Sequence, residues 1–235
     1  MAQCEKTSVD FRFNKWAQAD DVRAEKPDVV IVATGGLPNT SILELGEDLV
    51  LSTWDILSGD VKPGSTVLLF DDNGGQPGLQ AAELIAEAGS ALEIITPERF
   101  FAPDVGGLNH VHYARCFESH DVKITINRRL LAARRQGNQL IATVGSDYSD
   151  RRDDRTVDQI VVEHGTQPLD ELYFDLKEGS INRGEVDHSA LIEGRAQDKK
   201  TNRQGTYQLF RIGDAVSSRN VHAAIYDALR LCKDL

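Results

Sequence analysis

Residues 66–96, TVLLFDDNGGQPGLQAAELIAEAGSALEIIT, decide the fold of this chain. The apolar runs 66–70 and 91–96 predict buried strands, and residues 79–88 between them predict a helix. A strand, a glycine-bearing turn, a helix and a second strand in this order form a βαβ unit, whose strands are parallel. The sequence therefore predicts an α/β fold.

The turn in this unit has the spacing of a dinucleotide-binding fingerprint, Gly-x-Gly-x-x-Gly, which places backbone N–H groups and a helix N-terminus at a pyrophosphate. Asn73, Gly75 and Gly78 occupy the three glycine positions, and Gly74 lies between the first two. Asparagine tolerates left-handed backbone angles better than other non-glycine residues, so we expect the turn to form. Whether it binds a pyrophosphate or is a turn that binds nothing is left open.

An acidic residue about 20 positions further on is expected to hold the adenosine ribose. Glu98 lies 20 positions after Gly78, at the end of the second strand, and Thr96 is the other residue that could take that place. Arg99 could instead favour a 2′-phosphate. The choice between NAD and NADP therefore stays open.

Outside this unit, three more apolar segments end in glycine. Residues 28–34 (DVVIVAT) predict a buried strand, and residues 158–165 repeat it 130 positions later, with glycine and proline at matching places. Two similarly built nucleotide-binding modules would explain the match, and chance agreement of apolar residues is the alternative. Strand 207–212 completes the set. The candidate binding residues after these strands are Ala33, Thr34, Gly35, Gly36, Gly165, Gly213 and Asp214. Asp214 would accept a hydrogen bond from a ribose or ribityl hydroxyl, or cap the last helix.

The remaining elements are predicted from local patterns. We expect the tail of a helix over residues 1–8, strands at 9–13, 123–126, 128–133 and 139–144, and helices at 16–25, 108–119 and 221–233. The charged stretch 151–155 (RRDDR) is predicted to be a solvated loop. In the last helix, apolar residues at spacings of three and four predict a buried face. This face contains Ala224, Ile225, Ala228, Leu229 and Cys232.

Composition excludes several classes of partner. With 26 Lys and Arg against 37 Asp and Glu, the net charge is −11, which would repel nucleic acid and anionic membranes. The sequence has no apolar run long enough to span a bilayer and no secretory signal, so we expect a cytoplasmic protein. The three cysteines form no C-x-x-C pair, and we expect neither a metal site nor a disulfide. No Ser/His/Asp arrangement is present, so a bound cofactor would have to supply any chemistry.

Three motifs in the same chain resemble one known family. DVVIVATGGLPN (28–39), the unit 67–98 and FRIGDAVSSRNVHAAIYDA (210–228) are similar to the two-dinucleotide-fold region of NADH:flavin oxidoreductases. The branch resembled includes trimethylamine dehydrogenase, histamine dehydrogenase, 2,4-dienoyl-CoA reductase and N-methyl amino-acid demethylases. The resemblance implies two Rossmann-like domains of glutathione-reductase type: a discontinuous outer domain (1–60 and 176–235) that binds FAD or ADP, and an inserted NAD(P)-binding domain (61–175).

By the same resemblance, Ala33 to Gly36 with Gly213 and Asp214 would line the outer site. Asn73, Gly75, Gly78 and Glu98 would line the inserted site, and Gly165 would close it. Family members also carry an FMN-bearing barrel, a four-cysteine iron–sulfur segment and a first Gly-x-Gly-x-x-Gly, which this sequence lacks. The resemblance therefore implies a fragment or a subunit of a split enzyme, with an incomplete outer domain. We expect it to be inactive alone and to associate with itself or with a barrel-bearing partner.

Two functions remain at this point. The chain is either the electron-transfer region of a flavin oxidoreductase or an ADP-binding module with a structural or regulatory role. In both cases the chain would bind a nucleotide.

Overall fold

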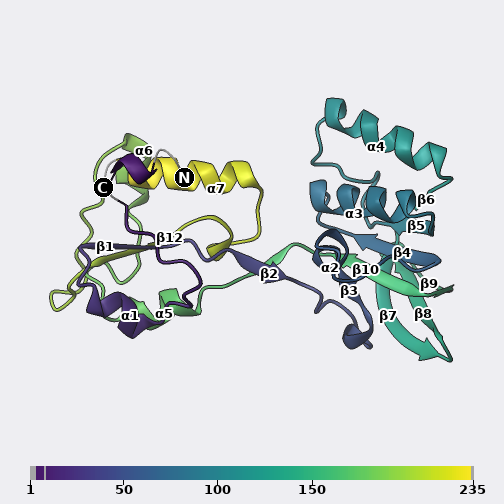
Figure 1. Cartoon of the computed structure of the whole chain (residues 1–235), viewed down its shortest axis with the longest axis horizontal. Coiled ribbons are helices and arrows are strands. Elements are labelled where there is room, and N and C mark those ends of the chain that lie inside the picture. Colours follow the sequence, from purple (N-terminus) through teal and green to yellow (C-terminus); the bar gives the residue numbers. More distant parts are fainter. Residues whose placement is uncertain (1–3, 8, 234–235) are drawn as a thin grey trace. The chain divides into compact units, whose positions relative to one another are not determined.

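The computed structural model describes residues 4–7 and 9–233. The chain divides into two compact units (Figure 1). Unit 1 comprises Met1–Gly35, Leu169–Val216 and Val221–Leu235, and unit 2 comprises Gly36–Pro168 and Ser217–Asn220. One unit is therefore inserted in the sequence of the other.

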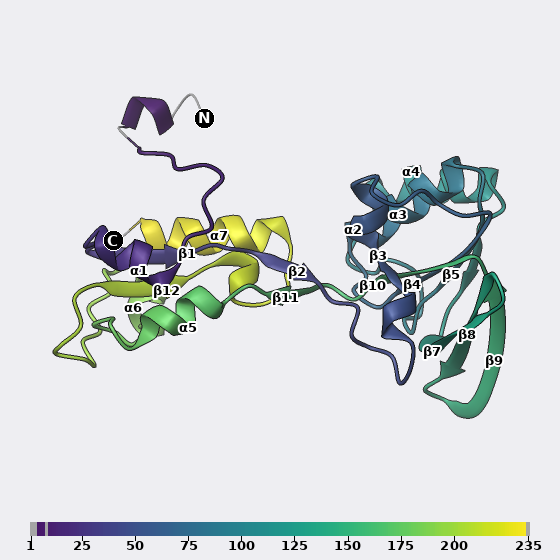
Figure 2. The same ribbon diagram turned by 60° about the horizontal axis from the view of Figure 1, so that its bottom comes forward.

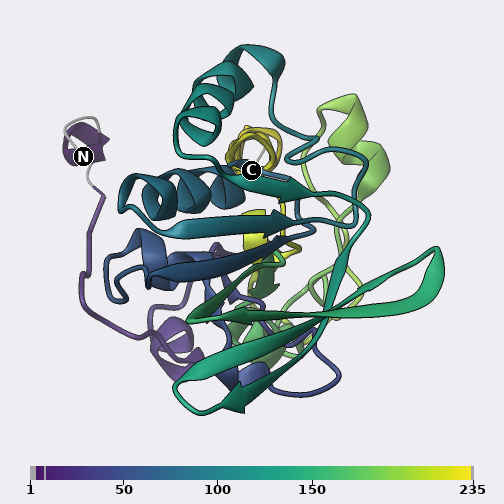
Figure 3. The ribbon, with the colours of Figure 1, turned by 90° about the vertical axis from the view of Figure 1, so that its right-hand side faces the viewer.

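A five-stranded parallel sheet forms the centre of unit 2 (Figure 3). Its strand order is β3–β10–β4–β5–β6, so the predicted βαβ unit lies in the middle of the sheet. Each strand is short, and β4 has five buried residues out of six because both faces of the sheet are covered. The strands are β3 (Leu51–Ser52), β10 (Gln159–Glu163), β4 (Thr66–Asp71), β5 (Ala91–Ile95) and β6 (Lys123–Thr125).

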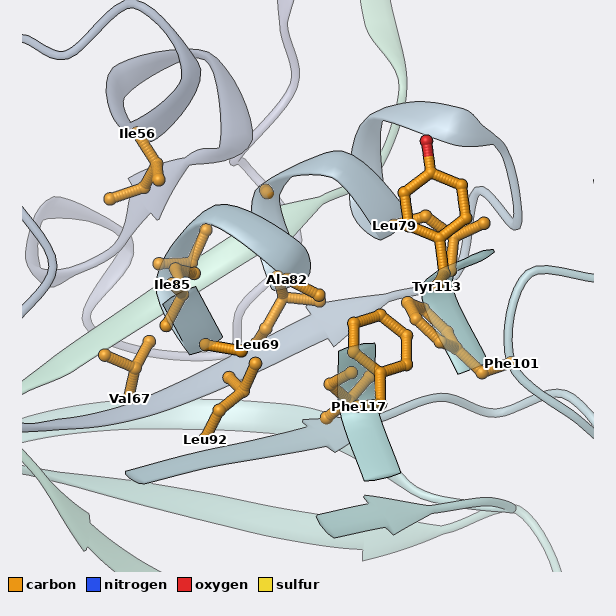
Figure 4. Close-up of a cluster of buried hydrophobic side chains, with 14 of the residues drawn as sticks. Ile56, Val67, Leu69, Leu79, Ala82, Ile85, Leu92, Phe101, Tyr113 and Phe117 are labelled. Atoms are coloured by element: carbon orange, nitrogen blue, oxygen red, sulfur yellow. The ribbon is translucent and has the colours of Figure 1, made fainter. Parts of the chain in front are cut away.

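Helices α2 (Thr53–Leu57), α3 (Gln76–Glu87) and α4 (Gly107–Ser119) lie over one face of this sheet. Val67 and Leu69 of β4 pack against α3 in a core that also contains the rings of Tyr113 and Phe117 (Figure 4). Because side chains alternate along a strand, the residues between them, Leu68 and Phe70, face the opposite side. Residues 66–70 thus contribute side chains to two hydrophobic cores, one on each face of the sheet.

The opposite face is covered by the antiparallel strands β7 (Arg129–Gln136), β8 (Gln139–Ser146) and β9 (Ser149–Val157). Strands β7 and β8 form an antiparallel hairpin, so the strands predicted at 128–133 and 139–144 are confirmed. The prediction of a loop at 151–155 is wrong, because these residues belong to edge strand β9. Asp154 accepts hydrogen bonds from Arg134 of β7 and Thr143 of β8, both at 2.9 Å, and Arg155 forms an ion pair with Glu93 of the parallel sheet at 3.0 Å.

Unit 1 is built on two parallel strands, β1 (Val29–Val32) and β12 (Gln208–Arg211). Helices α1 (Ala19–Ala24) and α5 (Glu171–Lys177) lie on one side of these strands and α7 (Val221–Cys232) on the other (Figure 1), and Figure 2 shows α5 and α7 on opposite sides of β12. The core of the unit includes Val30, Val32, Leu176 and Leu209. The remaining short elements of the chain are η1 (Cys4–Thr7), η2 (Glu47–Leu49), α6 (His188–Glu193) and η3 (Gly213–Ala215).

Two predictions for unit 1 are wrong. Residues 9–13 form no strand in the described part of the chain, and Phe11 and Phe13 stack on each other with ring centroids 5.5 Å apart. In α7, Ile225 and Leu229 are each 63% exposed and Cys232 is exposed too, although all three are predicted to face inward. The alanines of that helix, which are half-buried, and the buried Leu231 take the inner positions instead. The expected helical tail at 1–8 lies partly outside the described residues, and 4–7 form the 3-10 helix η1.

The predicted internal repeat corresponds to repeated local structure. Gly35 and Gly165 both have left-handed backbone angles, with φ of +74° and +65°, and each is followed by a short strand. These strands, β2 (Gly36–Pro38) and β11 (Thr166–Pro168), pair with each other in antiparallel fashion. The hydrogen bonds repeat as well: Leu169 N–H donates to Gly35 O, and Asn39 N–H donates to Gly165 O, both at 3.0 Å.

The boundaries of the two units differ from those that the resemblance implied. Residues 36–60 group with unit 2, because β3 pairs with β10 and α2 packs in the core of α3. Residues 169–175 group with unit 1, because α5 contributes Tyr173 to its core. Within the described residues, no helix has both the length and the apolar character needed to cross a membrane.

Candidate functional site

The glycine turn of unit 2 joins β4 to α3. Gly74 is its left-handed residue, with φ of +71°, whereas Asn73 is not among the positive-φ residues. Gly75 is the N-cap of α3, and Pro77 lies in the first helical turn. The turn therefore forms as the sequence predicted, but the tolerance of asparagine for left-handed angles is not what permits it.

Asn73 instead has a hydrogen-bonding role. Its Nδ2 donates to Glu163 Oε1 at 2.9 Å, and Gly165 N–H donates to the same oxygen at 3.1 Å. The other carboxylate oxygen of Glu163 accepts a hydrogen bond from the Thr53 hydroxyl. Because Glu163 is only 4% exposed, this network satisfies a carboxylate that has little access to water.

Asp71, the last residue of β4, lies at the centre of the turn and was missed by the sequence analysis. Its Oδ1 accepts hydrogen bonds from the backbone N–H groups of Asn73 and Gly74, both at 2.9 Å. The side chain is 1% exposed, and its Oδ2 has no hydrogen-bond partner among the described residues. An acidic residue that ends a buried strand immediately before the turn is the signal that could have identified it.

The environment of Asp71 favours its protonated form. Burial raises the pKa of this carboxyl from 3.8 to about 7; the nearby charge of Glu163 adds to the increase and the two turn N–H groups oppose it. Neighbouring Asp72 is held differently, with Oδ1 2.6 Å from His164 Nδ1. The end of β4 and the turn after it thus lie among three carboxyl groups, those of Asp71, Asp72 and Glu163.

The other predicted residues of unit 2 lie along the same edge of its sheet. Gly165 follows β10, and a Cβ placed on it would lie 3.4 Å from Asn73 Oδ1, so it borders the turn. Glu98 is exposed beyond the end of β5, whereas Thr96 is 1% exposed. The fold therefore brings the set to one edge, since β4 lies between β10 and β5.

In unit 1, the predicted residues lie at the carboxyl ends of β1 and β12. Val32 is in register with Arg211, and Ile212 N–H donates to Val32 O at 3.0 Å, so the segments that follow the two strands lie side by side. Ala33 and Thr34 are exposed, and Asp214 is half-buried. Gly36 falls in β2, where a Cβ would lie 2.7 Å from Gln167 O, so pairing of β2 with β11 requires glycine there.

Asp214 does not cap the last helix. α7 begins at Val221, seven positions later, and an N-cap residue directly precedes its helix. Asp214 lies in η3, one position after Gly213, whose φ is +62° and whose N–H donates to Asp227 Oδ2 at 3.0 Å. A half-buried carboxylate in this place is a suitable acceptor for a sugar hydroxyl.

Each unit also has an open hollow. The hollow in unit 1 has a volume of about 670 Å³ and touches Thr34, Lys15 and Arg23, but three acidic side chains line it too: Asp20, Glu171 and Asp175. The hollow in unit 2 has about 380 Å³ and contains Asp72, His164 and Arg129. Acidic groups thus equal or outnumber the cations around each hollow, so neither hollow is assigned to a pyrophosphate, and the candidate nucleotide site of unit 1 is the edge formed by the ends of β1 and β12.

The fold and the two glycine-bearing edges define a class: a pair of α/β units of dinucleotide-binding type. Comparison with solved structures agrees. The chain superimposes on 2-naphthoyl-CoA reductase in complex with 2-naphthoyl-CoA with a TM-score of 0.74 at 24% identity, over 100% of this chain and 31% of the other. Histamine dehydrogenase from Rhizobium sp. 4-9 gives 0.71 at 20% identity, over 95% and 33% of the chains. A pyridine nucleotide-disulfide family oxidoreductase from Enterococcus faecalis gives 0.55 at 16% identity, over 84% and 42%.

Sequence comparison identifies the relatives. The chain is 57% identical over its whole length to a probable N-methylproline demethylase of Rhizobium meliloti, and it covers 35% of that protein. It is 40% identical, over 96% of its length, to N,N-dimethylglycine/sarcosine dehydrogenase of Chromohalobacter salexigens, of which it covers 34%. A multifunctional alkene reductase/demethylase of Caballeronia cordobensis is 32% identical over 97% of this chain and 34% of its own length. No family model matches.

The chain is similar over nearly its whole length to these three relatives, which confirms the predicted resemblance to the trimethylamine dehydrogenase and 2,4-dienoyl-CoA reductase family of flavin oxidoreductases. It spans about a third of the length of the curated relatives it matches. The part that it represents is the pair of dinucleotide-binding-type units.

Proposed function

We propose that this chain is the nucleotide-binding, electron-transfer region of a flavin-dependent oxidoreductase, and that unit 1 holds an adenine nucleotide, either FAD or ADP. For the whole protein we propose oxidative demethylation of an N-methylated amino acid. The names of the two relatives at 57% and 40% identity, a demethylase and a dimethylglycine/sarcosine dehydrogenase, support this choice over an enoyl reductase.

The observation that carries the proposal is the paired edge of β1 and β12. The two strands are parallel and in register, and each is followed within three residues by a glycine with left-handed angles, Gly35 after β1 and Gly213 after β12. The carboxyl ends of parallel strands are where α/β folds bind nucleotides. A Cβ placed on Gly35 would meet no atom within 4 Å, so there is room for a ligand to approach the backbone.

The residues of unit 1 have a binding role in this proposal. The exposed turn Ala33–Gly35 offers backbone groups to the phosphate or ribityl part of the nucleotide, and the Asp214 carboxylate accepts a hydrogen bond from a sugar hydroxyl. When bound, a flavin supplies the redox chemistry, and the protein fixes its position and electrostatic surroundings. FMN and an iron–sulfur cluster would belong to other parts of the whole protein.

A second candidate is a structural or regulatory module that binds ADP without taking part in electron transfer. The buried carboxylate of Asp71 in the turn of unit 2 favours it, because this carboxylate disfavours a second nucleotide from which electrons could enter.

Calorimetric titration with ADP and with FAD tests the proposal. Gly35→Val should weaken binding at least tenfold, because a branched side chain fills the open space and cannot easily adopt φ of +74°. Gly59→Val is the matched control: Gly59 has φ of +80° and equally open surroundings, but it lies in unit 2, away from the proposed site.

Tight binding of FAD favours the electron-transfer region, and tight binding of ADP alone favours the structural module. If neither nucleotide binds, or if both variants bind like the unsubstituted protein, the nucleotide site in unit 1 is refuted.

A further inference from the structure

The turn of unit 2 uses its own backbone donors internally. In a nucleotide-binding turn, free N–H groups of the turn and of the first helical residues face the phosphates. Here the N–H groups of Asn73 and Gly74 both donate to Asp71 Oδ1. They are therefore not available to a ligand as long as the Asp71 carboxylate stays in place.

The first turn of α3 offers few donors in their place. Pro77 has no N–H group, so one of the positions that would face a phosphate is lost. The Asn73 amide, which could reach an anion, donates to Glu163 instead.

One glycine of the fingerprint, Gly78, is required by packing within the chain. A Cβ placed on Gly78 would collide with Asp71 Oδ2, so the buried carboxylate itself requires glycine there. Gly75 has no such reason, because the atom nearest to its Cβ position is 3.5 Å away. The spacing that indicates a pyrophosphate site therefore arises in part from the packing of an aspartate.

The charges at this edge also oppose an anion. Asp71 and Glu163 are 1% and 4% exposed, and Asp72 directly follows Asp71 after the end of β4. Of the cations nearby, Arg129 lies 2.8 Å from Asp147 and His164 pairs with Asp72. Desolvating a pyrophosphate beside two buried carboxylates is strongly unfavourable.

We propose that unit 2 is closed to pyridine dinucleotides because the carboxylate of Asp71 occupies the place that a nucleotide phosphate would take. The NAD(P) site predicted at Asn73, Gly75, Gly78 and Glu98 does not fit its intended ligand, and unit 2 is a structural unit. This inference concerns unit 2 alone, so it stands or falls separately from nucleotide binding by unit 1.

The first test is a titration of the whole protein with NADH and with NADPH at pH 8, repeated with Gly75→Ala. We expect that neither dinucleotide binds at this turn. The Gly75→Ala titration should therefore match that of the unsubstituted protein. Micromolar binding of either dinucleotide that is lost in a folded Gly75→Ala variant would overturn the proposal.

The second test examines the cause. Asp71→Ala frees the two turn N–H groups and removes the charge, and we expect its affinity for NADH to rise at least tenfold. If this variant does not fold, Asp71→Asn keeps the shape and removes the charge, and it should also bind NADH more tightly than the unsubstituted protein. Equal affinity of the folded variant and the unsubstituted protein would show that the carboxylate does not close the turn.

Discussion

Asp71 Oδ2 occupies the space that the Cβ atom of any larger residue at position 78 would need, so only glycine fits there. The two residues are on consecutive elements, the end of β4 and the first turn of α3, and the contact couples the strand to the helix. The glycine spacing of the fingerprint and a buried acid are thus parts of one packing arrangement.

The contact predicts that Gly78→Ala destabilises unit 2. A methyl group at this position must displace a buried carboxylate, and overpacking of this kind costs roughly 1–3 kcal/mol. The free energy of unfolding in urea measures the effect. Gly75→Ala is the control, with an expected cost below about 1 kcal/mol because it only changes an N-cap residue with free space around it. Equal stability of the two variants would contradict the contact.

The raised pKa of Asp71 predicts a stability that depends on pH. Between its unfolded value of 3.8 and its folded value of about 7, the folded protein binds more protons than the unfolded chain, so ionisation lowers stability as pH rises through this range. Asp71→Asn removes this loss. The free energy of unfolding of Asp71→Asn, relative to that of the unsubstituted protein, should rise by up to about 3 kcal/mol from pH 4.5 to pH 8.

Asp158 provides a control of opposite sign. The hydroxyl and backbone N–H of Thr66, both 2.9 Å from Asp158 Oδ2, lower the pKa of this carboxyl. Its contribution to stability is present above the unfolded pKa and is lost as pH falls, so Asp158→Asn should be less stable than the unsubstituted protein at neutral pH. An Asp71→Asn variant with the same pH profile as the unsubstituted protein would refute the assignment.

Restoring the first glycine of the fingerprint should not restore a nucleotide site. Asn73→Gly removes a hydrogen bond to the buried Glu163 carboxylate, and bonds to charged groups contribute roughly 1.5–3 kcal/mol. We therefore expect a loss of stability of that order in urea unfolding, with no gain of NADH binding. A variant that keeps full stability and binds NADH would show that Asn73 alone closes the turn.

The outer face of α7 predicts self-association. Val221, Ile225 and Leu229, each at least 63% exposed, follow one another along the helix at spacings of four. Light scattering after size exclusion should give a mass that rises with protein concentration, and Ile225→Lys should reduce this rise. Ile192→Lys on α6 is the control, because Ile192 is 76% exposed but stands outside this stripe. A concentration-independent monomer would exclude the association.

The sequence was most informative where an element's pattern has one physical cause. The buried strand at 66–70, the strand within 158–165 and the helix at 79–88 were predictable, because runs of apolar residues there are bounded by turn glycines. Strand β9 was not predictable, because each of its residues 151–155 is charged and the ion pairs that hold it come from residues far away in the sequence, such as Glu93.

The candidate sites, too, were predictable from the sequence only in part. Fingerprint spacing located the turn at 73–78, but spacing does not distinguish a glycine required by a phosphate from one required by Asp71. In α7, both Ile225 and Ala224 fit a helical stripe, and only the close approach of Ala224 to Gly213 decides which face packs inward. Such distinctions depend on three-dimensional contacts that no local pattern encodes.

The most direct test of the account is one calorimetric titration of ADP into the protein, carried out in parallel with Gly35→Val and Gly75→Ala. We predict that ADP binds, that Gly35→Val weakens binding at least tenfold, and that Gly75→Ala leaves it unchanged. The reverse pattern, with binding lost in Gly75→Ala and kept in Gly35→Val, would place the nucleotide in unit 2 and contradict the account.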